Sequence, residues 1–468
     1  GLLLLRAGEP VRLDLVARGA QLLVDDLHGR GYADARVRSA LVPVADRPDA
    51  VELRYDVDPG IAYRLAAVTL TGERWSRPAP LLRAADLKVG EPLTDAALEA
   101  ARTRLFRTGL FSRVDADVKK ADDGEARVTL GLAEKPRFHL GYGVRWESSV
   151  GTAAVLDFVD QSFLGRAITV GLRGLYQGDD RSGRLYLRTG GVLGTPISFE
   201  SYAEVRRLFT PGDANLVEDR KEVAVEALRP LDGRGHDTAH LYVRYRTTHI
   251  FEVVPDPFFP LDLEIRLPLA GLQLLRDTRD DKIDPRRGLL ASLDLSGSGS
   301  FLGSDFEYAR LFAQVASFRD VRLAGRPWTW AQSVRLGVEH PFAGQEIIRD
   351  ELFFAGGPYS VRGYRQETLG PQETLGLDVR PAGGEALFVI NEELRFALPA
   401  SLTGLVFFDA GQVWTRPRDA GFDLAKSIGL GLRAATPVGL LRLDAAYPLD
   451  RRPGDAVYKL YFGFGNAF

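Results

Sequence analysis

One charged side chain stands in a part of the sequence whose residue types point to a buried ion pair. The segment is flanked by glycines and aromatic residues and contains Val361, Arg362, Gly363 and Tyr364. A guanidinium does not lose its charge, so a fold that encloses Arg362 must supply carboxylates. Glu393 and Asp409 are the candidate partners, because each occupies an inward-looking position of a later alternating strand. The chemistry expected here is charge-assisted hydrogen bonding that holds a long segment in place.

The sequence offers no pattern for enzymatic chemistry. It contains neither a Gly-x-Ser-x-Gly elbow nor a His-Glu-x-x-His pair. Cysteine is absent, which excludes disulfides, thiolate metal ligands and cysteine nucleophiles. The histidines have no metal-ligand spacing, and the nearest pair, His236 and His240, lies in an expected turn without a third ligand. We therefore expect neither an enzyme nor a metal or cofactor site.

Composition and charge favour a protein built from many strands. The chain has 468 residues and a formal net charge of −3, which gives no argument for nucleic acid as a partner. No apolar run reaches the length of a membrane-spanning helix, about 18 residues. The 49 glycines, 15 tyrosines and 25 phenylalanines suit strands that have one wet face.

The larger, C-terminal part of the chain alternates with period two. Its last run has Tyr458, Leu460 and Phe462 on one face and Lys459, Tyr461 and Gly463 on the other. Apolar residues opposite charge and glycine reverse the pattern of a soluble core and suit a transmembrane barrel with a polar lumen. Residues 136–468 are long enough for about 16 antiparallel strands.

The first 135 residues mix helix and strand signals and contain an internal repeat. The run at 5–11 recurs at 87–93, and a helical pattern follows each copy. Strands are expected after these helices at about 34–44, 51–58, 111–119 and 125–134. The second copy also has a leading strand and a short helix. We therefore expect a partial α+β domain at 1–59 that lacks its first strand and helix, a complete domain at 60–135 and a barrel at 136–468.

Short motifs occur in a characteristic order along the chain. They are the turns at 31–37 and 108–114, the hairpin at 277–288, the segment 361–364, the strands at 391–396 and 407–411, and the terminal Phe468. Together they resemble the bacterial outer-membrane barrel-assembly and translocation superfamily typified by BamA and TamA, and TamA most of all. The resemblance implies periplasmic POTRA domains followed by a 16-stranded barrel in the bacterial outer membrane.

The resemblance also gives the site residues a role. It implies that Arg362 belongs to the sixth extracellular loop, which folds back into the lumen, where Glu393 and Asp409 on the barrel wall hold it. Arg362 then either braces the fold or takes part directly in transport, and the two roles are compatible.

Two devices would let such a protein fold or export other chains. The edge strands of POTRA domains can accept an extended segment by strand addition. The first and last barrel strands must pair, and glycines weaken packing at this lateral seam, which is made by Gly141, Gly143, Gly463, Gly465 and Phe468. Both features also have a purely structural interpretation, in which the POTRA edges only contact neighbouring domains and the glycines only relieve crowding where strands bend.

The partners that the resemblance implies are client outer-membrane proteins or autotransporters, the lipid bilayer and an inner-membrane-anchored periplasmic subunit. A two-partner-secretion pore for a soluble substrate, and the barrel of a POTRA-containing lipase autotransporter, remain alternatives. A passive porin has no need of residues 1–135 or of Arg362. A soluble propeller would show a blade-length repeat, which the sequence lacks.

Overall fold

The computed structural model divides the chain into two compact units. It describes residues 5, 8–44, 47–147, 151–178, 180–190, 195–210, 213–255, 258, 260–342, 344–375, 378–399, 402–436, 439–451 and 457–464. The first unit holds Gly1–His139 with the short segments Val159–Val170 and Thr189–Thr195. The second unit holds the rest of the chain. Among the described residues, no helix is both long enough and apolar enough to cross a membrane.

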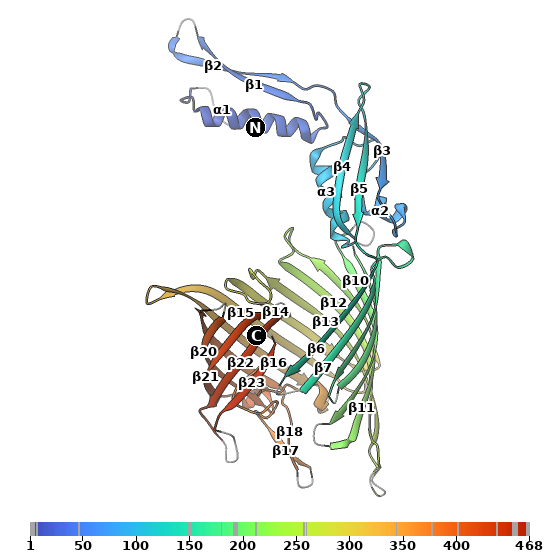
Figure 1. Ribbon diagram of the computed structural model, residues 1–468, viewed down its shortest axis with the longest axis vertical. Coiled ribbons are helices and arrows are strands. Elements are labelled where there is room, and N and C mark those ends of the chain that lie inside the picture. Colours follow the sequence, from blue (N-terminus) through green and yellow to red (C-terminus); the bar gives the residue numbers. More distant parts are fainter. Residues whose placement is uncertain are drawn as a thin grey trace. The chain divides into compact units, whose positions relative to one another are not determined.

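The first unit begins with one helix and a hairpin (Figure 1). These are α1 (Leu13–Gly29), β1 (Arg36–Val44) and β2 (Arg47–Asp58). The Tyr55 hydroxyl donates to the Val16 carbonyl oxygen at 2.9 Å, which ties the hairpin to the helix. The predicted helix and both strands are confirmed, with β2 beginning a few residues earlier than expected.

A second α+β region follows in the same unit. Its elements are β3 (Arg64–Thr71), α2 (Pro78–Ala85), α3 (Asp95–Arg107), β4 (Phe111–Lys120) and β5 (Glu125–Glu134). The three strands form a sheet in the order β3-β5-β4, with β3 parallel and β4 antiparallel to β5. The residue that caps α3 is Thr94, whose hydroxyl accepts from the Ala97 N–H at 3.1 Å. Ala101 and Leu105 of this helix are fully buried against the sheet.

The turn before α2 is fixed by one carboxylate. Glu134, at the end of β5, accepts hydrogen bonds from the backbone N–H groups of Arg74, Trp75 and Ser76 at 2.7–3.1 Å. The Ser76 hydroxyl in turn lies 2.9 Å from the hydroxyl of Ser162, which belongs to the same unit. Partial burial would raise the pKa of Glu134, but the hydrogen bonds from Ser76, Trp75 and Arg74 outweigh burial and lower this pKa below its usual range.

The rest of the chain builds one antiparallel sheet of 16 strands. The strands are β6 (Phe138–Glu147), β7 (Gly151–Asp160), β8 (Ile168–Gln177), β9 (Asp180–Thr189), β10 (Ser198–Thr210), β11 (Asp213–Pro230), β12 (Asp237–Glu252), β13 (Asp262–Asp277), β14 (Gly288–Ser298), β15 (Tyr308–Leu323), β16 (Arg326–Pro341), β19 (Ala386–Leu398), β20 (Leu402–Trp414), β21 (Ala425–Thr436), β22 (Gly439–Pro448) and β23 (Lys459–Phe464). Neighbours in the chain are neighbours in the sheet, and β16 pairs with β19. The predicted mixed fold class, α+β elements followed by an antiparallel sheet of about 16 strands, is confirmed.

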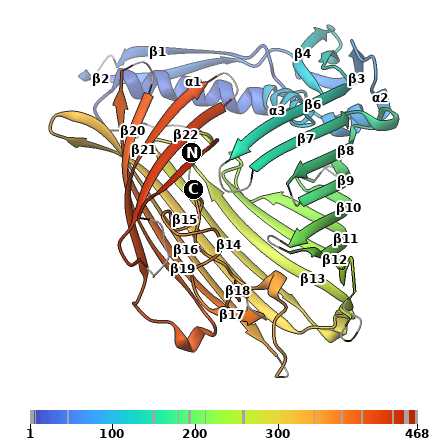
Figure 2. The same ribbon diagram turned by 60° about the horizontal axis from the view of Figure 1, so that its bottom comes forward.

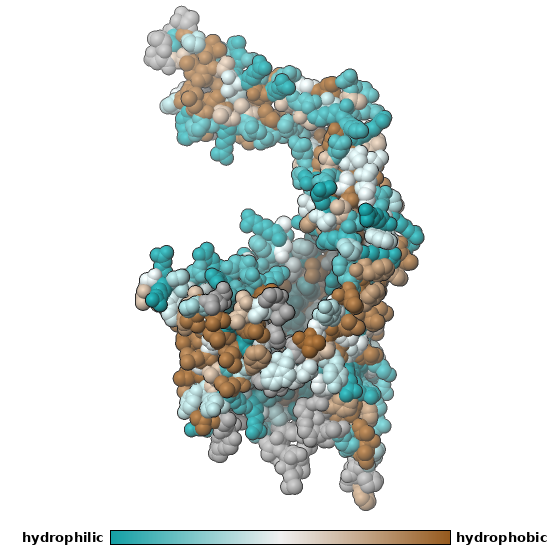
Figure 3. Space-filling view, in the orientation of Figure 1, coloured by the Kyte–Doolittle hydropathy of each residue, from teal (hydrophilic) through white to brown (hydrophobic). Residues whose placement is uncertain are grey.

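The sheet curls into a barrel, as Figure 2 shows, and its two faces differ in chemistry. Hydrophobic side chains gather over its outer surface in Figure 3. On β12, for example, Leu241, Val243 and Tyr245 are exposed, while Arg244 and Arg246 on the alternate face make ion pairs. The alternation expected from the sequence is therefore present, with apolar side chains outward and ions inward.

Candidate functional site

A long connection between β16 and β19 carries the arginine singled out in the sequence. We call residues 344–375 of this connection the strap. It contains the short 3₁₀ helix η4 (Arg349–Glu351) and the end of the connection forms a small hairpin of β17 (Gln372–Leu375) and β18 (Asp378–Pro381). Arg362 and Val361, at the tip of the strap, are fully buried.

Two carboxylates of the barrel wall bind the Arg362 guanidinium. Its Nε and Nη2 donate to the two oxygens of Asp409 at 2.7 and 2.8 Å, which is the bidentate arrangement, and its backbone N–H donates to Oδ2 at 3.1 Å. Its Nη1 donates to Oε1 of Glu393 at 2.8 Å. The structure therefore brings together the three residues that the sequence proposed. None of the three exposes its side chain to solvent.

An aromatic ring and a third acid complete the surroundings of Arg362. The guanidinium carbon lies 3.5 Å from the centre of the Phe407 ring, close enough for a cation–π interaction. Oδ2 of Asp444 on β22 lies 3.6 Å from Nη1. Gly429 on β21 makes room for the ring, because a Cβ at this position would overlap Phe407 and the Ala445 carbonyl oxygen.

The acids of the wall have further partners of their own. Arg395, two residues along β19, donates to Oε2 of Glu393 at 2.8 Å. Asn391, on the same face of β19, donates to Oδ1 of Asp409 at 2.8 Å. Arg433 of β21 donates to Oδ1 of Asp444 at 2.6 Å. Because other residues of the barrel wall hold each carboxylate in position, the acidic site is formed independently of Arg362.

The tip of the strap also binds the last strand. The Gly363 N–H donates to the hydroxyl of Tyr461 on β23 at 3.0 Å, and this hydroxyl donates to the Tyr364 carbonyl oxygen at 2.9 Å. The Tyr364 hydroxyl donates to the carbonyl oxygen of Lys426 at 2.9 Å. Gly363 has a positive φ of 95°, and an added Cβ would press on Pro448, so glycine is required at this position.

A second anchor holds the beginning of the strap with the charges reversed. Asp350 and Glu351 of η4 pair with Arg220 of β11 and Arg246 of β12, each at 2.5 Å. The hydroxyl of Tyr308 on β15 also donates to Glu351 at 2.9 Å. The strap is therefore bound to β11, β12 and β15 by its acids and to β19, β20 and β23 by Arg362 and its neighbours.

Three of the proposed seam residues, Gly141, Gly143 and Gly463, lie on the strands that end the strand order, β6 and β23. The rings of Trp146 on β6 and Phe462 on β23 lie 5.9 Å apart, so these strands come close at this point. Gly141 and Gly143 alternate with the exposed side chains of β6, and Gly463 lies next to Phe462. An added Cβ would meet only ordinary contacts at Gly141, whereas at Gly143 it would lie 3.3 Å from Val155. Gly465 and Phe468 fall outside the described residues.

The sequence did not identify every residue of the site. Asp444, Arg433 and Tyr461 stand on the polar faces of their strands, and this alternation was the only signal available. Their convergence depends on the path of the strap, which period-two patterns do not encode. The acids at 350 and 351 carried no motif and were missed.

Comparisons with known proteins agree on one family. The model described as the Omp85 superfamily domain matches residues 130–468. The outer membrane protein assembly factor BamA of Nitratidesulfovibrio vulgaris is 22% identical over 454 residues, which cover 94% of this chain and 55% of that protein. BamA of Neisseria meningitidis serogroup B is 21% identical over 499 residues, which cover 94% of this chain and 60% of that protein. The chain thus spans little more than half the length of these relatives.

Solved structures show the same fold. The crystal structure of BamA from Haemophilus ducreyi lacking POTRA domains 1-3 has a TM-score of 0.79 at 19% identity, covering 99% of this chain and 96% of that chain. CdiB from Acinetobacter baumannii has a TM-score of 0.57 at 13% identity, covering 98% and 82% of the two chains. At these sequence identities, the comparisons show a similar fold.

Proposed function

The chain belongs to the Omp85 superfamily, and we propose that it is an assembly factor that inserts client β-proteins into the outer membrane of a bacterium. Its relatives named as outer membrane protein assembly factors align with nearly the whole chain. The narrower likeness to TamA stays a prediction. The proposed activity is not enzymatic and requires no cofactor.

The observation that carries the proposal is the attachment of the last strand to the strap. Tyr461 of β23 bonds to the backbone of both Gly363 and Tyr364, beside the buried ion pairs of Arg362. A strand held on its lumen side by the strap is restrained independently of its pairing with β6. Such a barrel can open between β6 and β23 and keep its shape elsewhere.

An open seam would expose unpaired backbone groups to a client strand. A strand in lipid needs every N–H and C=O satisfied, so an exposed edge is a strong template for strand addition. Gly143 and Gly463 provide little side-chain packing where the two strands meet. We propose that a client strand pairs there before it leaves into the bilayer.

The N-terminal α+β regions would receive clients in the periplasm. In the complete region at 60–135, β3 and β4 form the edges of the sheet and are suited to strand addition. We propose that residues 1–59 and 60–135 are POTRA regions and that residues 136–468 are the barrel. Client proteins, lipid and an inner-membrane-anchored periplasmic subunit are the proposed partners.

The alternative functions for this fold are a secretion pore for a soluble substrate and the barrel of a lipase autotransporter. The TM-score with BamA exceeds that with CdiB, so the fold lies nearer to an assembly factor. A secretion pore would pass its substrate through the lumen and would not need β6 and β23 to separate. This difference decides the experiment.

A covalent bridge across the seam tests the proposal. Because the natural chain has no cysteine, Trp146→Cys with Phe462→Cys gives a single pair of thiols at positions whose rings lie 5.9 Å apart. The pair would be joined with a short thiol-reactive cross-linker in proteoliposomes, and the insertion of a client barrel would be followed. We expect insertion to stop in the bridged form and to return when the bridge is cleaved.

The matched control joins two strands that stay paired in any seam opening. Leu430 and Ala445 are direct partners on β21 and β22, so Leu430→Cys with Ala445→Cys should leave insertion unchanged after bridging. Full activity of the bridged seam variant would contradict lateral insertion. Release of a soluble substrate through the bridged barrel would favour the secretion pore instead.

A further inference from the structure

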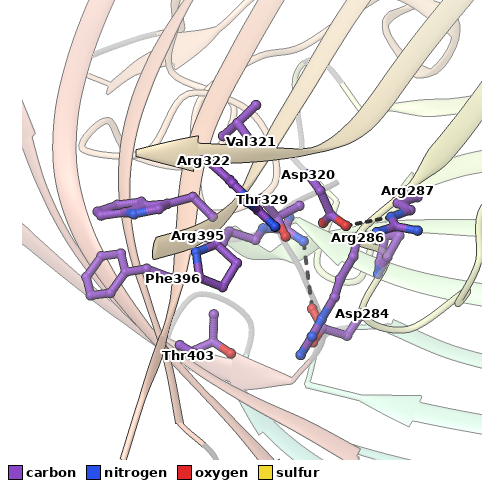
Figure 4. Close-up of a pocket in the computed structure, with 14 residues that line it drawn as sticks. Asp284, Arg286, Arg287, Asp320, Val321, Arg322, Thr329, Arg395, Phe396 and Thr403 are labelled. Carbon is purple, nitrogen blue, oxygen red and sulfur yellow. Dashed lines mark hydrogen bonds and ion pairs between the residues drawn. The ribbon is translucent and has the colours of Figure 1, made fainter. Parts of the chain in front are cut away.

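A cavity of about 320 Å³ lies in the barrel beside the strap site and has no place in the proposed insertion step. It is lined by the connection between β13 and β14 and by the adjoining ends of β15, β16, β19 and β20. By strand order, these ends lie where β6 begins, which is the end that faces the periplasm in the proposed orientation. Figure 4 shows its charged residues, which are Asp284, Arg286, Arg287, Asp320, Arg322 and Arg395.

Arginine exceeds acid in this cavity, and two of the arginines are uncommitted. Arg287 pairs with Asp320 at 2.5 Å, and Asp284 lies 3.8 Å from Arg395. The side chains of Arg286 and Arg322 are exposed and make no hydrogen bond or ion pair within the described part of the chain. The cavity therefore presents two free guanidiniums to any anion that enters it.

The backbone holds Arg286 and Arg287 in place. Asp280 accepts hydrogen bonds from the N–H groups of both residues, at 2.9 and 3.1 Å. Gly288, with a φ of 108°, allows the chain to turn close to the Thr278 carbonyl oxygen, where a Cβ would not fit. Because the backbone of the connection is fixed, a ligand has to order only the arginine side chains when it binds.

The cavity is lined by both faces of the barrel wall, since Trp328 and Phe396 belong to the outward face, but its charged strand residues face inward, which favours a peptide over a lipid. Asp320 and Arg322 share the inward face of β15 with Phe318, which is buried and lies near Arg395. The outward face of the barrel carries the apolar residues that lipid would cover. An anion reaches the inward face through the aqueous lumen, as an unfolded polar segment does.

We propose that this cavity binds a carboxylate of an acidic segment in a client chain, with Arg286 and Arg322 as its ligands. The forked guanidinium matches a carboxylate in bidentate geometry. The client identity of the segment rests on the proposed assembly function, whereas the carboxylate site itself does not. Arg395 links the cavity to the strap, because it bonds to Glu393, which in turn binds Arg362. A bound carboxylate competes with Asp284 for Arg395, and the change at Arg395 affects the strap through Glu393 and Arg362.

Binding of a labelled peptide to the purified full chain in nanodiscs tests this site. The probe is a short extended peptide rich in aspartate, and its twin carries asparagine at the same positions. Fluorescence anisotropy should give a Kd for the acidic peptide at least about fivefold lower than for its twin, with the difference shrinking as salt is added. Arg286→Ala with Arg322→Ala should weaken the acidic peptide at least about fivefold.

Two further variants make the test independent of misfolding. Arg319→Ala removes an exposed arginine from the outward face of β15 and should leave the Kd unchanged. Asp284→Asn removes the acid that competes for Arg395 and should tighten binding about twofold or more. Equal Kd values for the two peptides, or an unchanged Kd in the double variant, would overturn the site. Displacement of the peptide by equimolar inorganic phosphate would overturn the assignment to a peptide carboxylate.

The same preparations separate this inference from the proposed function. Client insertion is measured on wild-type protein, without the peptide. Insertion without selective peptide binding removes the carboxylate site and leaves the assembly function standing. Selective binding without insertion by the wild-type protein keeps the site and removes the assembly function.

Discussion

Gly363 and Tyr461 join two parts of the chain that are almost a hundred residues apart. The Gly363 N–H donates to the Tyr461 hydroxyl at 3.0 Å, and both groups are buried. The hydroxyl then donates to the Tyr364 carbonyl oxygen at 2.9 Å, so it acts both as an acceptor and as a donor toward the strap. Loss of this hydroxyl would remove the hydrogen-bond partner of the buried Gly363 N–H and a donor to the Tyr364 carbonyl oxygen.

We therefore expect Tyr461→Phe to detach the last strand from the strap without changing its shape. Leaving buried polar groups unpaired should cost about 1–3 kcal/mol. The temperature at which the folded barrel band is lost on semi-native gels should fall. Tyr458→Phe, on the exposed face next to the same strand, is the control and should show no change. A variant Tyr461→Phe with wild-type melting would show that the strap does not restrain β23.

Arg362 should tolerate neither truncation nor replacement by lysine. Arg362→Ala leaves Asp409 buried without its cation and removes one of the cations that bind Glu393, which keeps Arg395, and the expected cost is about 3–5 kcal/mol. Arg362→Lys keeps the charge but loses the bidentate bond to Asp409, so it should lie between the alanine variant and the wild type. Barrel melting and protease access to the strap measure the effect. Equal behaviour of the lysine variant and the wild type would show that charge alone suffices.

A methyl group added to the barrel wall at Gly429 should also destabilise the site of Arg362. Gly429→Ala would place Cβ against the Phe407 ring and the Ala445 backbone, and a strand ladder has little freedom to move. We expect a loss of stability of about 1–3 kcal/mol, as for other overpacked sites. Gly174→Ala, in β8 of the same sheet, has no atom within 4 Å of the new Cβ and should be neutral. Comparable melting of the two variants would contradict tight packing around Arg362.

The turn held by Glu134 should weaken in acid. The folded pKa of this carboxyl is lowered, so its stabilisation is complete above the unfolded pKa of about 4.3 and is lost as the pH falls through the folded value. Hydrogen-exchange protection of the amides of Trp75 and Ser76 should fall in the same range. Glu134→Gln should remove this pH dependence, whereas Glu125→Gln, at the exposed start of β5, should keep it. A pH-independent protection of the wild type would refute the assignment.

The sequence predicted the barrel and its ion pair for a physical reason. Period-two alternation assigns every strand residue to a face, and a charge on an inward face needs an opposite charge near it. Arg362, Glu393 and Asp409 could be matched on these grounds. The helix α3 followed equally from a local pattern, the helical periodicity after the repeat at 87–93.

What the sequence could not show depends on distance in space. The approach of Tyr461 to Gly363 requires the path of the strap through the lumen, which no local pattern contains. Asp350 and Glu351 look like ordinary surface acids until β11 and β12 present their arginines. Arg286 belongs to a recognisable hairpin motif, but only the barrel wall turns that hairpin into one side of a cavity.

The two anchors of the strap carry opposite charges. The acids of η4 meet arginines on β11 and β12, and Arg362 meets acids on β19 and β20. If the segment were threaded backwards, carboxylates would face carboxylates and guanidiniums would face guanidiniums, at a cost that the low-polarity interior magnifies. The charge arrangement of the lumen thus selects a single chain direction for the strap.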